Sequence, residues 1–368
     1  MPQYIHEESD WADFRYNQAE YSALLSQVWR RQGHLIGQMT ALGFEVRQQT
    51  ELETLIIEIE KTSEIEGEYL DTEQVRSSVA RRLGMDTSGL PKPESDVEGV
   101  VEMMLDATRN FKSSLTAQRL FDWHLALFPA ENTRLRPLRR GTWRDDRTGV
   151  MQVLSGAMGR ERVHFEAPAA ERLEGEMSRF LDWFNTDNTT DGLLKAALAH
   201  LWFVTIHPFE DGNGRIARAI ADMALARADD CEQRFYSMSA QIRKERKEYY
   251  NVLERTQSGT LDVTEWIVWF LGCLNRSLEA SESTVQKVTA KARFWLNCSQ
   301  FNINERQKAL INQLIDGFTG KLNTSKWAKI AKCSQDTAHR DITQLIDYGI
   351  LEKEEAGGRS TSYRLRDQ

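Results

Sequence analysis

Residues 207–218, HPFEDGNGRIAR, concentrate the groups that phosphoryl or nucleotidyl transfer requires. His207 precedes Pro208, whose ring ends a helix and disfavours helical backbone at the residue before it. We therefore expect the His207 imidazole at a helix end, facing a loop, where it can act as a general base. Asp211 offers a hard carboxylate oxygen of the kind that Mg²⁺ prefers when it is shared with substrate phosphates.

The second half of this segment predicts a phosphate-binding site. Gly212 and Gly214 flank Asn213, and glycine allows positive φ and close approach of the backbone to an anion. Their N–H groups can converge where the next helix presents the positive end of its dipole. Arg215 and Arg218 lie one turn apart, so both guanidinium groups can reach one polyphosphate. Each feature alone is more often structural, but together they form a complete set for nucleotidyl transfer.

The elements that must position this segment are helices. Apolar residues recur at spacings of three and four through most of the chain, which predicts a mainly α fold. Residues 198–206 and 216–228 predict helices on both sides of the motif. Stripes over residues 21–39 and 52–59 predict two more helices in an N-terminal helical region, residues 1–112.

Two segments depart from this helical pattern. The short β-favouring runs VMQV and RVHF, within residues 144–165, predict a β-hairpin. Residues 290–368 predict a winged helix, because a helix and a helix-turn-helix precede two short strands joined at the tetrapeptide AGGR. A late core helix around residue 266 and a polar helix over 276–292 are expected before that unit.

Composition excludes several classes of protein. The 368 residues suit two or three domains, and 40% hydrophobic with 28% charged residues is ordinary for a globular chain. A formal charge of -8 argues against a chain that coats nucleic acid along its whole length. The four cysteines form no CxxC pair, and no signal peptide or membrane-spanning run is found, so we expect a cytoplasmic protein without membrane contact.

The segment 207–218 resembles the signature of the Fic family, HxFx[D/E]GNGRxxR, at every motif position. The resemblance covers residues 113–275 as the catalytic core, and it implies transfer of AMP from ATP to a Ser, Thr or Tyr hydroxyl of a protein, the chain itself included. It implies that Phe209 anchors the loop and that the base is His207. The implied Mg²⁺ ligand and phosphate-binding residues are Asp211, Gly212, Asn213, Gly214, Arg215 and Arg218.

The family resemblance also gives roles to the hairpin and to a later helix. It implies that the hairpin is a flap that pairs with an extended segment of the target, formed by Val150, Met151, Gln152 and Val153. Tyr250 and Gln257 are candidate contacts to the nucleotide base. A plain structural hairpin and ordinary core packing of the tyrosines are the alternatives for these two segments.

An inhibitory segment is the third feature that the resemblance implies. Thr62, Glu66 and Gly67 fit the inhibitory motif [S/T]xxxE[G/N], on a helix expected over about residues 52–70. We expect the Glu66 carboxylate to pair with Arg218 and to compete with the outer phosphates of ATP, with Thr62 orienting the carboxylate. A solvated helix turn is the alternative.

Two other functions remain open at this stage. Glu66 could orient a water molecule that removes AMP from modified proteins at the same site. The chain could instead be a DNA-binding regulator, with the recognition helix carrying Ser334, Gln335, Thr337, His339 and Arg340. Residues 321–368 hold nine Lys or Arg and seven Asp or Glu, a net charge of only +2. Winged helices also bind proteins, so a homodimer is a further candidate assembly.

Overall fold

The chain folds into two compact units, Met1–Val285 and Gln286–Gln368, in a computed structural model. The structure describes residues 2–87, 89–129, 138–147, 149–155, 162–315, 318, 320–354 and 361–366. Helices dominate both units, which confirms the predicted mainly α fold. Within the described residues, no helix combines the length and apolar character needed to cross a membrane.

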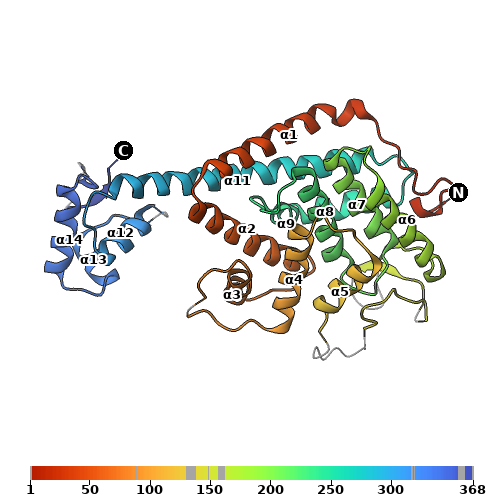
Figure 1. Ribbon diagram of the computed structural model, residues 1–368, viewed down its shortest axis with the longest axis horizontal. Coiled ribbons are helices and arrows are strands. Elements are labelled where there is room, and N and C mark those ends of the chain that lie inside the picture. Colours follow the sequence, from red (N-terminus) through yellow and green to blue (C-terminus); the bar gives the residue numbers. More distant parts are fainter. Residues whose placement is uncertain are drawn as a thin grey trace. The chain divides into compact units, whose positions relative to one another are not determined.

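The first unit is a helical assembly with one small hairpin (Figure 1). Helix α7 is apolar all round and buried, and α8, which packs against it, is buried throughout residues 215–226. The elements are the short 3₁₀ helices η1 (Ile5–Glu7) and η2 (Ala170–Arg172), α1 (Gln18–Ala41), α2 (Phe44–Ile65), α3 (Thr72–Arg82), α4 (Ser95–Arg109), α5 (Ala117–Leu127), β1 (Gln152–Ser155), β2 (Arg162–Glu166), α6 (Leu173–Thr186), α7 (Gly192–Ile206), α8 (Asn213–Asp229), α9 (Met238–Lys244), α10 (Arg246–Gln257) and α11 (Thr264–Cys298), which continues into the second unit.

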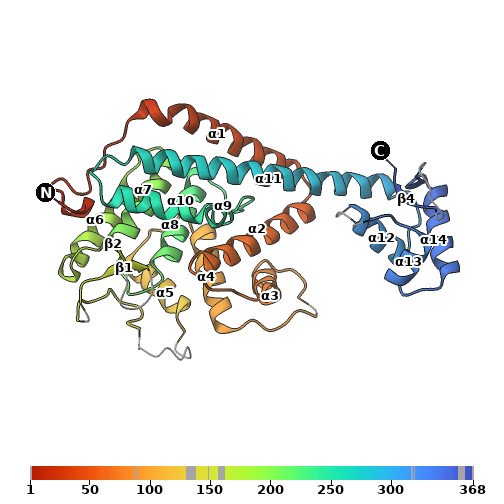
Figure 2. The same cartoon turned by 180° about the vertical axis from the view of Figure 1, so that it is seen from behind.

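One hydrophobic core joins the N-terminal helices to the helices that flank the motif. Val28 of α1, Ile59 of α2, Phe203 of α7, Ile220 of α8 and Leu271 of α11 belong to the same buried cluster, and none has exposed surface. Polar contacts follow the same packing. On α1, which runs beside α11 in Figures 1 and 2, Arg31 lies 3.5 Å from a carboxylate oxygen of Glu282. The N-terminal helices are thus fixed against the helices that flank the motif.

Three element boundaries differ from those expected from sequence. Helix α2 ends at Ile65 rather than near residue 70, because Gly67 takes a φ of 86° and the Glu68 N–H donates to the Ser63 carbonyl in a Schellman-type end. The helices expected around 266 and over 276–292 are one helix, α11, since residues 276–292 contain no glycine or proline. Strand β1 begins at Gln152, two residues later than the VMQV run suggested.

The hairpin packs beside α10, and the view from behind brings both into sight (Figure 2). Strands β1 and β2 are antiparallel, with Val153 opposite Phe165, and the register shifts between Val153 and Leu154. A small cluster separate from the main core lies under one face of the hairpin. A two-stranded hairpin is marginal in water, so it depends on whatever covers that face.

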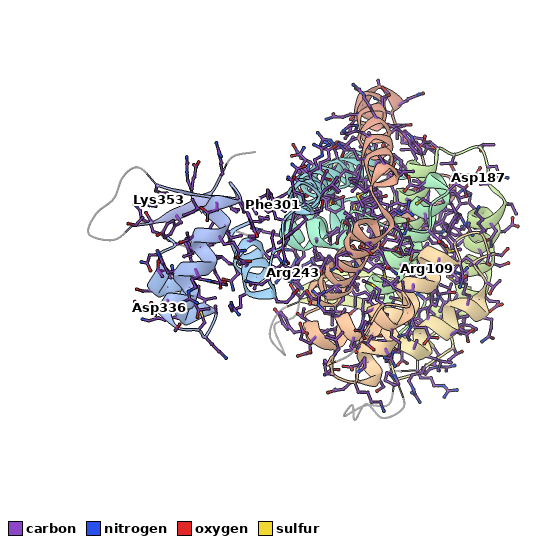
Figure 3. The ribbon with its side chains drawn as sticks, turned by 60° about the vertical axis from the view of Figure 1, so that its left-hand side comes forward. Arg109, Asp187, Arg243, Phe301, Asp336 and Lys353 are labelled. Carbon is purple, nitrogen blue, oxygen red and sulfur yellow. The ribbon has the colours of Figure 1, made fainter. Side chains whose placement is uncertain are left out.

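The second unit has the order helix, helix-turn-helix and two strands. Trp327, Ile342 and Leu345 form its core, and β3 pairs antiparallel with β4. Figure 3 shows Asp336 in the first turn of α14 and Lys353 on β3 toward opposite ends of this unit. The AGGR tetrapeptide lies outside the described residues. The elements are α12 (Glu305–Ile315), α13 (Thr324–Ile330), α14 (Gln335–Asp347), β3 (Leu351–Lys353) and β4 (Tyr363–Leu365).

Close packing of α4 against α5 gives a stability test. A Cβ added at Gly99 would lie 1.8 Å from the Ala126 carbonyl oxygen, so Gly99→Ala must push the two helices apart. We expect it to lower the free energy of unfolding by at least about 2 kcal/mol in urea titrations. Gly175→Ala on α6 is the control, because nothing lies within 4 Å of its Cβ. That control should stabilise by about 0.5–1 kcal/mol, and equal effects of the two would contradict this packing.

Candidate active site

The junction between α7 and α8 holds its key residue in a strained backbone conformation. His207 ends α7 with φ 53° and ψ 56°, the left-handed region that non-glycine residues rarely adopt. Its N–H still donates to the Phe203 carbonyl at 3.0 Å, and Pro208 then turns the chain away, as the sequence predicted. Such a conformation costs on the order of 1–3 kcal/mol and is found mostly at functional sites.

The His207 imidazole is set up to accept a proton. Nδ1 lies 3.2 Å from the Val204 carbonyl oxygen, which can only accept, so Nδ1 carries the hydrogen and Nε2 keeps its lone pair. Burial disfavours the imidazolium form and lowers the pKa of His207 to about 4, and nearby Arg144 acts in the same direction. His207 is therefore neutral at pH 7, the state that a general base needs.

Three side chains brace the loop that follows His207. Arg144 is almost completely buried, and its Nε donates to the His207 carbonyl at 2.8 Å. Asn213 closes a ring with the Phe209 backbone, because its Nδ2 donates to the carbonyl at 2.8 Å and its Oδ1 accepts from the N–H at 3.0 Å. Phe209 has no exposed surface and stacks on His124 at 4.3 Å. The Asn213 side chain thus shapes the loop, and its contact with phosphate stays a prediction.

The first turn of α8 can receive an anion. Its N-cap is Gly212, with φ 82°, and this residue supplies no side-chain capping bond to the helix. A Cβ at Gly214 would meet the Glu66 carboxylate at 2.2 Å, so glycine is required there while Glu66 is in place. Within the described residues, Nη1 of Arg218 is buried without a hydrogen-bond partner, and it lies 3.2 Å from that same Cβ position. An uncapped helix start and an unpaired guanidinium nitrogen therefore lie together.

Two carboxylates at the end of α2 hold the two arginines of the motif. The Glu66 Oε1 atom lies 2.8 Å from Arg218 Nη2, and the Thr62 hydroxyl accepts from Arg218 Nε at 2.7 Å. Thr62 therefore binds the arginine, whereas the sequence suggested that it would orient Glu66. Glu68 forms an ion pair with Arg215, whose guanidinium also lies over the Phe128 ring.

A cavity of about 460 Å³ joins these groups to the hairpin. Its lining includes His207, Glu66 and Gly214, so the residues predicted to be the base, the inhibitory group and a phosphate contact share one cavity. Tyr250 and Gln257 also line it, as does Tyr249, which is otherwise buried and lies against His200. Of the four residues predicted for the flap, Val153 alone lines this cavity; Val150 and Met151 precede β1, and Gln152 donates to Glu166.

Asp211 is the residue of this site that suits a divalent cation. Its Oδ1 accepts from the Gly212 N–H at 2.7 Å, which holds the carboxylate at the mouth of the loop. Among the described residues, no three His, Cys, Asp or Glu side chains come together as a metal cage. That arrangement fits Mg²⁺ bound through one carboxylate and substrate phosphates.

Sequence reasoning did not identify three residues of this site. Glu68 was missed because it lies outside the expected inhibitory motif, although its acidic side chain two residues after Glu66 was a visible signal. Arg144 was missed because its partner, the His207 carbonyl, is distant in sequence. Glu254 was missed for the same reason, and it holds His164 of β2 at 2.7 Å.

Comparison with known families agrees with this geometry. Residues 114–225 match the Fic/DOC family, a range that contains the complete motif and helices α5 to α7. Residues 114–225 are thus a Fic/DOC domain. Residues 4–85 match a second description, a domain of unknown function (DUF4172), so the N-terminal helices and the Fic domain are recognised separately.

Relatives and solved structures place the Fic domain within longer proteins and a known fold. The chain is 26% identical over 219 residues to a protein adenylyltransferase Fic of Drosophila willistoni, covering 58% of this chain and 39% of that protein. It is 34% identical over 115 residues to one of Nematostella vectensis, covering 31% and 25%. The chain thus spans less than half the length of these curated relatives.

The fold of the chain resembles that of a solved Fic family protein. The crystal structure from Desulfovibrio desulfuricans matches with a TM-score of 0.55 at 21% identity, and covers 95% of this chain and 96% of that one. A Fic-domain signaling protein from Bacteroides thetaiotaomicron matches with a TM-score of 0.52 at 19% identity, over 73% and 97%. These likenesses establish the fold.

The protonation state of His207 can be measured directly. Because burial opposes the charged form, we expect its ring carbon NMR signal to titrate with a midpoint near pH 4 and to stay constant from about pH 5.5 to 8. His207→Ala identifies the signal among the seven histidines by its disappearance. A midpoint near pH 6.5 would show that the imidazole is solvated and not held as described.

Proposed function

We propose that this protein transfers AMP from ATP to a Ser, Thr or Tyr hydroxyl of a protein, with itself among the acceptors. The observation that carries this proposal is the shared cavity, which joins a neutral His207 to an uncapped helix start at Gly214. A base beside a polyphosphate site suits the activation of a hydroxyl for attack on phosphorus. The adenylyltransferase names of its relatives support the same chemistry.

The reaction needs one displacement at the α-phosphorus. The acceptor hydroxyl oxygen forms the new bond to that phosphorus while its proton moves to Nε2 of His207. The bond from the α-phosphorus to the bridging oxygen breaks, and pyrophosphate leaves with both electrons of that bond. The first turn of α8 and Arg215 would offset the charge of the phosphates. Asp211 would hold Mg²⁺, which when bound with ATP would supply further charge neutralisation.

Glu66 supports the proposal that the enzyme is autoinhibited. The carboxylate occupies Nη2 of Arg218 at 2.8 Å and lies against Gly214, where an outer phosphate would otherwise bind. ATP bound beside it would therefore lie in a shifted position, and its α-phosphorus would not be in line with the attacking hydroxyl oxygen. Misplacement on this scale can cost about 10²-fold in rate.

Replacing Glu66 tests both the activity and its inhibition. We expect Glu66→Gly to raise incorporation of labelled AMP into the protein by tenfold or more, up to about 10²-fold, by mass spectrometry. Adding His207→Ala should abolish that incorporation while leaving ATP binding largely intact, because the base acts on the hydroxyl, and base removal costs about 10² to 10⁴ in rate. Lower incorporation with Glu66→Gly, together with release of free AMP from modified protein by the native chain, would instead support the AMP-removing reaction.

Glu68 extends this inhibition to the second arginine. Gly67, with φ 86°, reverses the chain at the end of α2, so two carboxylates on either side of it face the same turn of α8. Arg215 is almost completely buried, and a buried guanidinium needs a partner. Glu68 supplies that partner until a phosphate does, so both arginines are withheld from ATP.

A matched pair of variants isolates this contribution. Glu68→Ala should tighten ATP binding and raise AMP incorporation, by a smaller factor than Glu66→Gly because Glu68 is the more exposed carboxylate. Glu64→Ala is the control, since Glu64 pairs with Lys61 and Arg243 and touches neither motif arginine. Isothermal titration with ATP should show no change for the control. Equal ATP affinity in Glu68→Ala and the native chain would show that Glu68 does not contribute to inhibition.

The second unit favours nucleic-acid contact as a second function. Gln335, His339 and Arg340 are exposed on α14, the second helix of a helix-turn-helix. Asp336 in the same turn opposes phosphate, so the unit would bind DNA weakly and with few ion pairs. Gel shifts of the full chain over a salt series should show binding that weakens steeply, with a loss on Arg340→Ala. Salt-independent retention of a protein partner would instead make this unit a protein-binding module.

A further inference from the structure

The segment before α1 packs against the hairpin that walls the active-site cavity. The Tyr4 and His6 rings stack on each other, with centroids 5.9 Å apart, and both meet the Phe165 ring of β2 in T-shaped geometry at 5.2 Å and 5.7 Å. All three side chains are buried. In Figure 2 the N-terminal end of the chain lies on the side of the first unit that carries β1 and β2.

Tyr4 completes the small core of the hairpin. The buried members of that cluster are Tyr4, Phe165 and Ala167, with Met151 and Val153 packed against them at the edge. One of the three buried side chains therefore comes from outside the hairpin. Because two strands alone are marginal in water, loss of the Tyr4 ring should leave the hairpin with too little buried surface to stay fixed.

A hydrogen bond also links the N-terminal segment to the end of β2. His6 Nε2 lies 2.8 Å from the Glu166 carbonyl oxygen, so that nitrogen carries a hydrogen and donates it to the end of β2. Arg172 Nη2 donates in turn to the His6 carbonyl at 3.3 Å. The turn is also closed internally, because the Gln3 and Tyr4 N–H groups both donate to the Glu7 carboxylate.

The other side of the hairpin reaches the reaction site. Val153, Leu154, His164 and Phe165 line the cavity that contains His207. Phe165 thus contacts the N-terminal segment and also walls the cavity, so its position is transmitted directly to the site. At the same time Leu154 is half exposed, which leaves the hairpin open to an incoming chain.

We propose that Tyr4 and His6 are positioning residues, which fix the β1–β2 hairpin and through it the acceptor hydroxyl over the α-phosphorus. This inference rests on the proposed AMP transfer, and it gives a role to the start of the domain of unknown function. Main-chain pairing with a hairpin aligns a hydroxyl only as well as the hairpin itself is held. The contact between Glu254 of α10 and His164 holds one part of the hairpin, and the contact between His6 and the Glu166 carbonyl holds the end of β2.

Variants at residue 4 can test this without releasing the rest of the N-terminal segment. The segment is anchored separately further on, because Trp11 Nε1 donates to Glu176 at 2.8 Å and the Arg15 N–H donates to the Leu261 carbonyl at 2.8 Å. Tyr4→Ala removes the ring, whereas Tyr4→Phe keeps it and loses only the contact of its hydroxyl with Gln3. Tyr21→Ala controls for general destabilisation, since Tyr21 is equally buried on α1 but packs on Tyr16.

Amide hydrogen exchange of the full chain measures how firmly the hairpin is held. In Tyr4→Ala we expect amides of residues 152–155 and 162–166 to exchange about tenfold faster or more, with the amides of α8 unchanged. Tyr4→Phe and Tyr21→Ala should leave hairpin exchange at the native rate. Unchanged exchange in Tyr4→Ala would overturn the proposal, because the hairpin would then be held without the segment.

The effect on the reaction is measured by the kinetics of self-modification in the Glu66→Gly variant. With labelled ATP, Tyr4→Ala should lower the kcat of self-modification about tenfold and change the KM for ATP less than threefold, because the phosphate site is untouched. His6→Gln, which keeps an amide donor for Glu166, should retain most of the rate that His6→Ala loses. A native kcat in Tyr4→Ala despite faster exchange would also overturn the proposal. No incorporation by the Glu66→Gly parent would instead overturn AMP transfer, while the exchange experiment would still decide what holds the hairpin.

Discussion

The buried guanidinium of Arg218 is the constraint on which the arrangement of the first unit depends. A cation with almost no exposed surface must be neutralised by nearby acceptors, and here Glu66 and the Thr62 hydroxyl and carbonyl supply them. Thr62 lies on α2 and Glu66 caps the end of that helix, so the N-terminal helices cannot pack elsewhere without leaving that charge unpaired. One continuous core from α1 to α11 is the structural consequence. A phosphate that replaces Glu66 would satisfy the same cation, which makes the contact exchangeable.

A second constraint is the strained turn at His207, which is stabilised by contacts with neighbouring residues. Left-handed backbone at a non-glycine residue persists only where surrounding contacts over-determine it. Arg144 ties the His207 carbonyl, Asn213 closes the loop on Phe209, and the aromatic cluster around Phe209 fills the space beneath. The result is an imidazole whose Nδ1 is committed to Val204 and whose Nε2 remains basic. Strain and catalytic readiness are two outcomes of the same packing.

The features that could be predicted from sequence are those set by residues close together in the chain. The motif residues 207–218 are contiguous, and proline and glycine chemistry act on their immediate neighbours, so the helix, turn and helix followed directly. The pairing of Glu66 with Arg218 required the family resemblance, and the structure adds that Thr62 binds the arginine. Contacts between distant segments, such as Glu68 with Arg215, leave no periodicity or spacing to detect. The flap was displaced by two residues because β propensity marks a strand weakly at its ends.

The N-terminal region contacts the candidate site at two places. The end of α2 holds the motif arginines, and the segment around Tyr4 supports the hairpin wall of the same cavity. Both contacts are made by one stretch of chain, since α1 and α2 follow that segment directly and share the main core. A shift of α2 that freed Arg218 therefore need not disturb the hairpin, because Trp11 and Arg15 anchor the segment to α6 and to the start of α11. The two contacts can thus be changed separately, although both reside in the same matched region.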